Sequence, residues 1–254
     1  MELLSVKNLR LSFATARGTA EILKGVSFDM GCEKLGVVGE SGSGKSLAAR
    51  ALLDLVPAPG VYMADEMRFM GRDLLGMSGK ERRAVRGHEM GLILQDPKFS
   101  LNPIMRVGEQ LMEALRDRDA VLKMLERVCI DDPLRVFKSY PFELSGGMGQ
   151  RVMIAMMMLL KPKLLIADEP TSSLDATKRG GILKTLDALV QEEKMGLLFI
   201  SHDLRLVANF CDRVIVMRAG EVVDICPARE LVKSQHPYTQ SLMKSLPSLE
   251  KEVA

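Results

Sequence analysis

The stretch GESGSGKS occupies residues 39–46, directly after the apolar run LGVV (35–38), and its last residue opens the sequence SLAARALLDL (46–55). It fits the pattern G-x-x-x-x-G-K-[ST], whose glycine-rich backbone curls around phosphate groups. The run before it has the character of a buried strand, and the sequence after it has the character of a helix. A strand, a phosphate loop and a helix in this order predict an α/β protein that binds a nucleotide.

Each part of this phosphate loop (residues 39–46) has a chemical task. Gly42 and Gly44 allow the backbone to turn so that successive N–H groups point at phosphate oxygens, and the positive end of the following helix adds to this attraction. Lys45 is expected to reach the β- and γ-phosphates of ATP, and the Ser46 hydroxyl is expected to ligate Mg²⁺. The predicted nucleotide-binding residues of the loop are Gly39, Glu40, Ser41, Gly42, Ser43, Gly44, Lys45 and Ser46.

A second motif, LLIADEP (164–170), supplies the other half of such a site. Its four apolar residues predict a buried strand, and Asp168 follows at the carboxyl end, where it is expected to hold Mg²⁺ through water. Glu169 comes next and is expected to polarise the attacking water as a general base. The two motifs together predict an enzyme that hydrolyses ATP.

A third motif, LSGGMGQR (144–151), opens a strongly apolar helix. Ser145 is a natural N-cap, and Gly146 and Gly147 allow close approach of the backbone to an anion. Taken alone, this piece fits an ordinary capped helix. Because the chain already has one phosphate site and this turn is distant from it in sequence, we interpret it as a second phosphate-binding element.

The composition narrows the class of protein. The charges of 35 Lys and Arg against 33 Asp and Glu nearly cancel, which argues against a nucleic-acid groove. The longest uncharged apolar run (152–160) is shorter than the roughly 20 residues that a helix needs to cross a bilayer, and its methionines are expected to pack in a core. The four cysteines lie far apart, without a CxxC pair, which favours free buried thiols over a metal site. They are Cys32, Cys129, Cys211 and Cys226.

Strands and helices are expected to alternate over most of the chain, which predicts a mostly parallel α/β sheet with ligands at its carboxyl edge. The region from about residue 107 to residue 161 differs, because its pattern is nearly all helical. We interpret it as a helical subdomain inserted into the α/β core. The expected strands are 3–9, 22–28, 35–38, 91–94, 164–167, 196–200 and 213–217, and the expected helices outside the insertion are 46–55, 176–193 and 204–210.

In this order, the three motifs and ISHD (200–203) resemble the ATP-binding cassette (ABC) ATPases over essentially the whole chain. The resemblance implies that the signature turn (Ser145, Gly146 and Gly147) of one subunit caps the γ-phosphate bound to the phosphate loop of a second subunit. It implies a P-loop NTPase core with a mostly parallel sheet, N-terminal antiparallel strands and an inserted helical subdomain. The implied division is 1–96 and 164–235 for the catalytic core, 97–163 for the helical subdomain and 236–254 for a C-terminal tail.

The same resemblance assigns roles to four further residues. Gln95, in LILQDP, is similar to the glutamine that contacts Mg²⁺ and the attacking water, and His202 is similar to the switch histidine that contacts the γ-phosphate. Asp175 would communicate across the dimer, and Phe13 is the candidate for stacking on adenine. The implied catalytic residues are therefore Glu169, His202 and Gln95, and the implied Mg²⁺ ligands are Ser46, Gln95 and Asp168.

A finer resemblance is to the importer branch for dipeptides, oligopeptides and nickel. It is carried by the stretches 95–111 and 140–158 and above all by the tail HPYTQSLMKSLP (236–247), which lies outside the catalytic core. It implies a second ABC ATPase subunit, identical or homologous, two membrane permeases and an extracytoplasmic solute-binding protein that acts indirectly. The chain would then lie peripherally on the cytoplasmic face of the inner membrane and bind no nucleic acid.

Two departures from the family pattern accompany these similarities. Met148 stands where the common signature has glutamine, and Cys32 stands in a turn where glycine is usual. We expect an altered turn at Cys32 without loss of function. The alternatives to a transport motor are a nucleotide-binding scaffold subunit whose partner performs most of the hydrolysis, a soluble ABC ATPase without a transport role, and an exporter.

Overall fold

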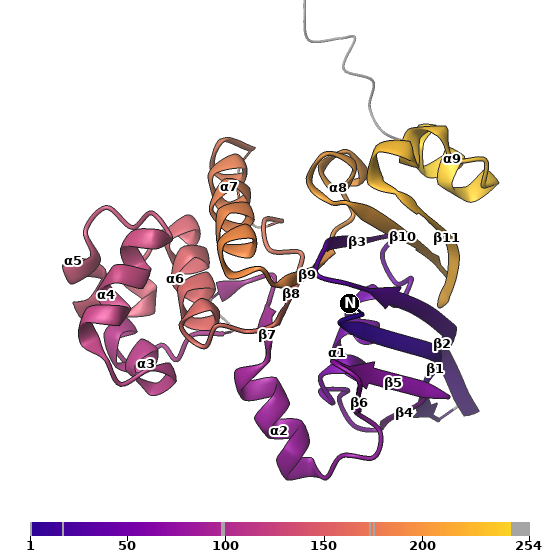
Figure 1. The fold of residues 1–254 in the computed structure, drawn as a ribbon, viewed down its shortest axis with the longest axis horizontal. Coiled ribbons are helices and arrows are strands. Elements are labelled where there is room, and N and C mark those ends of the chain that lie inside the picture. Colours follow the sequence, from indigo (N-terminus) through magenta and orange to yellow (C-terminus); the bar gives the residue numbers. More distant parts are fainter. Residues whose placement is uncertain (1, 17, 98–99, 173, 175, 245–254) are drawn as a thin grey trace, which may run out of the picture. The chain divides into compact units, whose positions relative to one another are not determined.

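The computed structural model describes residues 2–16, 18–97, 100–172, 174 and 176–244, and it divides into two compact units (Figure 1). Gly76–Leu198 forms one, here called the helical unit. Glu2–Leu75 and the described residues from Phe199 to Lys244 form the other, here called the phosphate-loop unit. In the described part of the chain, no helix combines the length and the apolarity that crossing a bilayer requires.

The phosphate-loop unit contains an antiparallel sheet built from the N-terminal strands. The long strands β1 (Leu4–Thr15) and β2 (Gly18–Met30) pair with each other, and β1 also pairs with β4 (Gly60–Met63) and β5 (Glu66–Phe69). The short strand β6 (Arg72–Asp73) pairs antiparallel with β5. This arrangement agrees with the predicted N-terminal antiparallel strands.

A second group of strands in the same unit holds the phosphate loop. The strand β3 (Lys34–Val38) runs parallel to β10 (Arg213–Arg218), with Val38 opposite Val216, and β10 forms an antiparallel hairpin with β11 (Glu221–Pro227). The helix α1 (Lys45–Leu52) begins inside the loop, as expected, and α8 (Leu204–Phe210) has the predicted bounds. The unit's last described elements are the 3-10 helix η3 (Ala228–Lys233) and α9 (Pro237–Lys244).

In the helical unit, the segments that lead to Gln95 and to the Asp168-Glu169 pair are neighbouring strands. After the polar helix α2 (Gly79–His88), β7 (Met90–Ile93) runs parallel to β8 (Leu164–Asp168), with Ile93 opposite Ala167. Every residue of β8 is buried, as the continuous apolar run predicts. The chain passes from this unit to the other within β9 (Gly196–Ile200).

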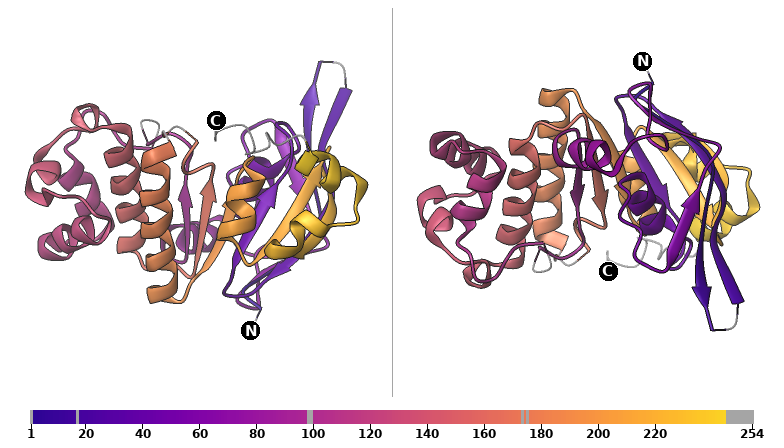
Figure 2. Two further views of the ribbon diagram at one scale, coloured as in Figure 1. Left: turned by 90° about the horizontal axis from the view of Figure 1, so that it is seen from above. Right: turned by 90° about the horizontal axis from the view of Figure 1, so that it is seen from below.

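Helices fill the rest of the helical unit, which agrees with the helical pattern that the sequence shows between residues 107 and 161. Figure 2 shows α6 and α7 lying side by side, and these two helices are in contact. Residues on α6 such as Met153 and Met158 are buried, so packing is their role. The helices in chain order are α3 (Val107–Ala114), α4 (Arg118–Arg127), α5 (Pro133–Lys138), η2 (Pro141–Glu143), α6 (Gly146–Leu159) and α7 (Ala176–Glu193).

The cysteines correct one expectation. All four are free, as predicted, but only Cys211 is buried, whereas Cys226 is half-buried and Cys32 and Cys129 are exposed. The prediction of buried thiols is therefore wrong for Cys32 and Cys129, which lie in turns between elements and not in the apolar runs that build the core.

The four-part division of the chain stays a prediction.

Candidate functional site

The phosphate loop follows β3 directly and depends on glycine at its first residue and at the N-cap of α1. Gly44, the N-cap of α1, has a left-handed backbone with φ of 99°. Gly39 has φ of 153°, and a Cβ atom built on it would lie 2.1 Å from the carbonyl oxygen of Met217 on β10. No side chain fits at Gly39 unless the loop moves away from β10. The positive φ at Gly42, 82°, agrees with the predicted turn of the backbone.

The side chain of Lys45 is buried within this loop. Its ammonium group donates hydrogen bonds to the carbonyl oxygens of Gly39 (2.8 Å) and Glu40 (2.9 Å), and it lies 3.4 Å from the hydroxyl of Ser43. The cation is therefore held by the loop in which the sequence predicts the phosphates to bind. A lysine at this position supplies a positive charge, so that a phosphate is attracted both by its ammonium group and by the backbone N–H groups of the loop.

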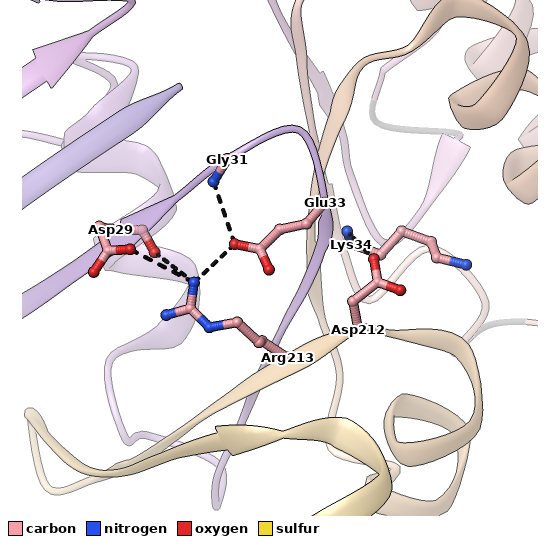
Figure 3. A network of polar contacts seen from close by, with 6 residues as sticks. All are labelled: Asp29, Gly31, Glu33, Lys34, Asp212 and Arg213. Carbon is pink, nitrogen blue, oxygen red and sulfur yellow. Dashed lines mark hydrogen bonds and ion pairs between the residues drawn. The ribbon is translucent and has the colours of Figure 1, made fainter. Parts of the chain in front are cut away.

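The start of the loop-bearing strand β3 is fixed by a polar network, drawn in Figure 3. Arg213 pairs with Glu33 at 2.8 Å, and the same carboxylate oxygen accepts a hydrogen bond from the N–H of Gly31 at 3.2 Å. Cys32, between these two residues, does not have a positive φ, so this turn accommodates a side chain where the family usually has glycine. The network comprises Asp29, Gly31, Glu33, Lys34, Asp212 and Arg213.

His202 lies at the same end of the phosphate-loop unit as the phosphate loop. The N–H of Ser201, the residue before it, donates to the carbonyl of Val37 at 3.1 Å, next to the end of β3. The residue after it, Asp203, caps α8 by accepting a hydrogen bond from the N–H of Leu206 at 3.0 Å. His202 itself is exposed. Its neighbours therefore hold it beside the phosphate loop with its imidazole accessible.

Phe13 is half-buried near the end of β1. Its ring packs closely over Gly60, because a Cβ atom built on Gly60 would lie 2.7 Å from the Cε1 atom of the ring. Gly60 is directly opposite Phe13 in the β1–β4 ladder. The role of Phe13 in stacking on adenine stays a prediction.

The helical unit brings Gln95, Asp168 and Glu169 to one sheet edge. Because Ile93 is opposite Ala167 in parallel strands, Gln95, two residues after β7, and Asp168, the last residue of β8, both lie at the carboxyl ends of neighbouring strands, and Glu169 comes directly after. Asp168 is buried, while Glu169 is half-buried with a positive φ of 52°. The carbonyl of Glu169 accepts hydrogen bonds from the N–H (3.2 Å) and the hydroxyl (3.0 Å) of Ser172, which fixes the turn after the strand.

The signature turn forms an exposed N-terminus of α6. The hydroxyl of Ser145 accepts a hydrogen bond from the N–H of Met148 at 3.3 Å, so the predicted N-cap is present. This bond uses the backbone of Met148, and methionine in place of glutamine therefore leaves the cap intact. Gly146 lies close to Leu174, and Gly147 lies close to Lys178 of α7, a neighbour that sequence reasoning missed.

Two cavities adjoin the signature turn within the helical unit. One, of about 240 Å³, joins it to the segment that follows Gln95 and is lined by Asp96, Pro97, Leu101, Pro141, Leu144, Ser145, Gly146 and Gly149. The other, of about 450 Å³, lies toward α7 and carries the charged side chains of Asp131, Asp132, Arg135, Arg151 and Lys178. The signature turn therefore shares one cavity with the segment after Gln95 and another with α7.

The structure therefore gathers the predicted residues into two groups. The phosphate-loop unit brings together the phosphate loop and His202, and the helical unit brings together Gln95, Asp168, Glu169 and the signature turn. Asp175 lies outside the described residues. The three predicted Mg²⁺ ligands, Ser46, Gln95 and Asp168, offer hydroxyl, amide and carboxylate oxygens, which is the donor set that this hard cation prefers.

A family model described as ABC transporter matches residues 23–172, more than half of the chain. This chain belongs to the ABC transporter family. The oligopeptide transport ATP-binding protein OppD of Bacillus subtilis is 45% identical to it over 261 residues, which cover 98% of this chain and 73% of that protein. The dipeptide transport ATP-binding protein DppD of Escherichia coli is 43% identical, and the match covers 97% of this chain and 79% of that protein.

Solved structures of ABC cassettes have the same fold. A dimeric bacterial ABC transporter cassette matches with a TM-score of 0.76 and 26% identity, over 89% of this chain and 99% of that one. A structure of the same cassette in a post-hydrolysis state with ADP and phosphate matches with a TM-score of 0.73 and 25% identity, over 89% of this chain and 99% of that one. The predicted fold class is confirmed, and the chain is an ABC ATPase that binds ATP.

Proposed function

We propose that this chain is the ATP-hydrolysing subunit of an importer for peptides or nickel and that it powers uptake through partner permeases. The observation that carries the proposal is the similarity over nearly the whole chain to proteins named for oligopeptide and dipeptide transport. The HPYT tail adds to it, because it belongs to the stretches that resemble this branch of the family. We place the chain on the cytoplasmic face of the inner membrane, held there by the permeases.

In this function, the phosphate-loop unit binds the nucleotide. The N–H groups of residues 39–46 point at the phosphates, and Lys45, positioned by the carbonyls of Gly39 and Glu40, binds the β- and γ-phosphates. His202, exposed beside the loop, contacts the γ-phosphate. Bound Mg²⁺, held by Ser46, Gln95 and Asp168, would draw negative charge from the phosphate oxygens. Positioning and charge stabilisation of this kind account for most of the catalysis of phosphoryl transfer.

The helical unit supplies the attack and the contact with a second ATPase. Glu169 polarises the attacking water from its fixed turn after β8, and Gln95 orients that water. Ser145 and Gly146 of the signature turn are exposed and the turn begins the helix α6, so it presents the positive end of a helix to an anion. We propose that it caps the γ-phosphate bound to the partner ATPase, so that ATP holds two subunits together until hydrolysis.

Two strongly exposed apolar side chains of the helical unit are candidates for contact with a permease. Ile104 is 83% exposed and Phe142 is 74% exposed, which is unusual for large apolar side chains. Phe142 stacks on Tyr140 with ring centroids 5.5 Å apart, and Arg106 lies over the other ring at 5.3 Å, so the aromatic pair is fixed in place. We propose that this apolar surface (Ile104, Tyr140 and Phe142) receives a cytoplasmic helix of the permease.

The test is Mg-ATP hydrolysis by the complex assembled with its permeases and partner ATPase, comparing the native chain with Glu169→Gln. Glutamine keeps the size of the side chain but cannot act as a base. Glu126→Gln, which changes an exposed glutamate on α4, is the matched control. We expect hydrolysis that depends on the permeases, that falls by two or more orders of magnitude in Glu169→Gln, and that is unchanged in the control.

The same experiment separates the alternative functions. An unchanged rate in Glu169→Gln would mean that the partner ATPase performs the chemistry and that this chain is mainly a nucleotide-binding scaffold. Hydrolysis that neither needs nor responds to permeases would favour a soluble ABC ATPase. Uptake of labelled peptides and of nickel by vesicles that contain the complex then decides between the two solutes.

A further inference from the structure

The C-terminal segment that contains HPYT is fastened to the strand β11 by one carboxylate. Asp224 of β11 accepts hydrogen bonds from the hydroxyls of Ser234 and Thr239, the latter at 2.8 Å. Thr239 is fully buried, and the hydroxyl of Ser234 also accepts a hydrogen bond from the N–H of His236 at 3.1 Å. Pro237 begins α9 between these anchors. The first turn of α9 therefore has a fixed position on the sheet.

This anchoring places Tyr238 between β10 and the phosphate loop. The side chain is only 6% exposed, and the guanidinium of Arg218, the last residue of β10, lies 4.7 Å from the centre of its ring. A cation over an aromatic face is attractive, most of all away from water. A phenylalanine ring could make the same contact with Arg218. The contact therefore does not explain why the side chain carries a hydroxyl.

The hydroxyl of Tyr238 lies close to Glu40, the second residue of the phosphate loop. Burial raises the pKa of the phenol, and the backbone and the carboxylate of Glu40 are the next influences on this pKa. The hydroxyl makes no hydrogen bond of ordinary geometry within the described residues. A buried hydroxyl costs free energy unless it interacts with another polar group. For the hydroxyl of Tyr238, the polar group close by is Glu40.

Glu40 is also directly linked to the phosphate-binding lysine. Its carbonyl oxygen accepts one of the hydrogen bonds of the Lys45 ammonium, at 2.9 Å. The turn between β10 and β11 reaches the same loop, because the N–H of Gly220 donates to the carbonyl of Ser43 at 3.1 Å. Two separate parts of the unit therefore contact the phosphate loop. One is the β10–β11 hairpin, through Gly220, and the other is the phenol of Tyr238 on α9.

We propose that Tyr238 is a positioning residue of the nucleotide site. Held by Asp224 and Arg218, it sets the position of Glu40, and through the carbonyl of Glu40 it sets the position of Lys45. The HPYT segment then contributes to nucleotide affinity as well as covering the sheet. This inference rests on the proposed function, in which Lys45 binds the phosphates of ATP.

The test measures the Kd for Mg-ATP and the thermal unfolding of the nucleotide-free full-length chain. Tyr238→Phe removes only the hydroxyl. Tyr62→Phe is the matched control, because the hydroxyl of Tyr62 donates to Asp54 in the same unit. We expect Tyr238→Phe to raise the Kd about three- to tenfold with an unchanged Tm, as for the loss of one polar interaction, and Tyr62→Phe to leave the Kd unchanged.

A second pair of variants acts through the anchor of α9. Thr239→Val removes the hydrogen bond to Asp224 and should raise the Kd for Mg-ATP. Thr239→Ser keeps the hydroxyl and should have a Kd close to that of the wild type. In the assembled complex, Tyr238→Phe should raise the KM for ATP and leave kcat within about twofold, because a weakened interaction that is shared by bound ATP and the transition state changes KM alone. A residue that served only for packing would lower the Tm without such a change.

Two results would overturn the inference in distinguishable ways. If the wild-type chain binds Mg-ATP and Tyr238→Phe binds it equally well, the positioning role is wrong and the proposed function stands. If the wild-type chain binds no Mg-ATP, or if Lys45→Ala binds it as well as the wild type does, the proposed function is wrong and the inference falls with it.

Discussion

Gly149 of α6 lies directly against Pro97, so that a Cβ atom built on Gly149 would be 3.2 Å from Cγ and 3.3 Å from Cβ of the proline ring. Pro97 is two residues after Gln95, and Gly149 is two residues after the signature turn. The absence of a side chain at one position therefore sets how closely the segment after Gln95 approaches the signature helix. Two parts of the proposed mechanism that are distant in sequence meet at this contact.

Gly149→Ala should therefore slow ATP hydrolysis. The new methyl group pushes Pro97 away by a few tenths of an ångström, and a displaced Gln95 orients water less well, so we expect kcat to fall several-fold with little change in the Kd for ATP. Alanine favours a helix over glycine by roughly 0.5–1 kcal/mol, so the variant should not be less stable. Gly180→Ala on α7, where nothing lies within 4 Å, is the control. Equal rates in both variants would contradict the prediction.

Gly39→Ala should weaken nucleotide binding. The added Cβ meets the carbonyl of Met217 at 2.1 Å, and the loop must leave β10 to accept it. Gly71→Ala separates this clash from backbone strain, because Gly71 also has a positive φ, 76°, but has nothing within 4 Å. We expect the Kd for Mg-ATP to rise at least tenfold for Gly39→Ala, equivalent to about 1.4 kcal/mol, and to stay near the wild-type value for Gly71→Ala. A fluorescence titration with a labelled ATP analogue measures it.

The elements that the sequence predicts well are those with a continuous apolar run or a clear helical pattern. The helices α7 and α8 have the predicted bounds, and β3, β8 and β9 agree with their apolar runs within a residue. The phosphate loop and the Asp-Glu pair could be predicted because each depends on a short motif that follows a buried strand. Their chemistry is local, and no long-range contact is needed to recognise them.

The sequence pattern does not predict several other elements, and the reason can be given for each. The helix α2 is so polar that only Arg82 and Val85 are buried, and this leaves no apolar stripe to recognise. Its Ser78-x-x-Glu81 capping box was the available signal. The strands β4, β5 and β6 are short, and β11 mixes polar with apolar residues. The approach of Tyr238 to Glu40 joins residues about 200 positions apart, which a single sequence does not reveal.

The apolar surface of the helical unit gives a prediction about coupling. Ile104→Ser should lower the hydrolysis that depends on the permease at least several-fold, since it removes apolar area that the permease would cover. Hydrolysis by the ATPase without permeases should not change, because Ile104 is not among the proposed nucleotide-binding residues. Val232→Ser, at a valine that is 68% exposed on η3, is the control. Co-purification with the permeases measures assembly directly, and undiminished coupling in Ile104→Ser would contradict the assigned surface.

The capping box of α2 makes part of the stability of the helical unit depend on pH. The carboxylate of Glu81 accepts hydrogen bonds from the hydroxyl (2.6 Å) and the N–H (2.8 Å) of Ser78, and these bonds lower the pKa of Glu81 below its usual value of 4.5. A carboxyl group whose pKa is lowered by folding stabilises the folded state above its unfolded pKa. That contribution is lost as the pH falls through the folded pKa.

Ser78→Ala should therefore destabilise the protein at pH 7.5, by about 1 kcal/mol as is typical of a lost N-cap, and by less at a pH well below 4. At low pH the wild type has itself lost the bonds to the Glu81 carboxylate, whereas the bond from the N–H of Glu81 to the Ser78 hydroxyl is not titrated. Ser78→Thr keeps the cap and should follow the wild type. Urea unfolding of the three proteins at both pH values measures the differences. A gap between wild type and Ser78→Ala that stays constant or widens in acid would show that the Glu81 carboxylate does not contribute to the cap.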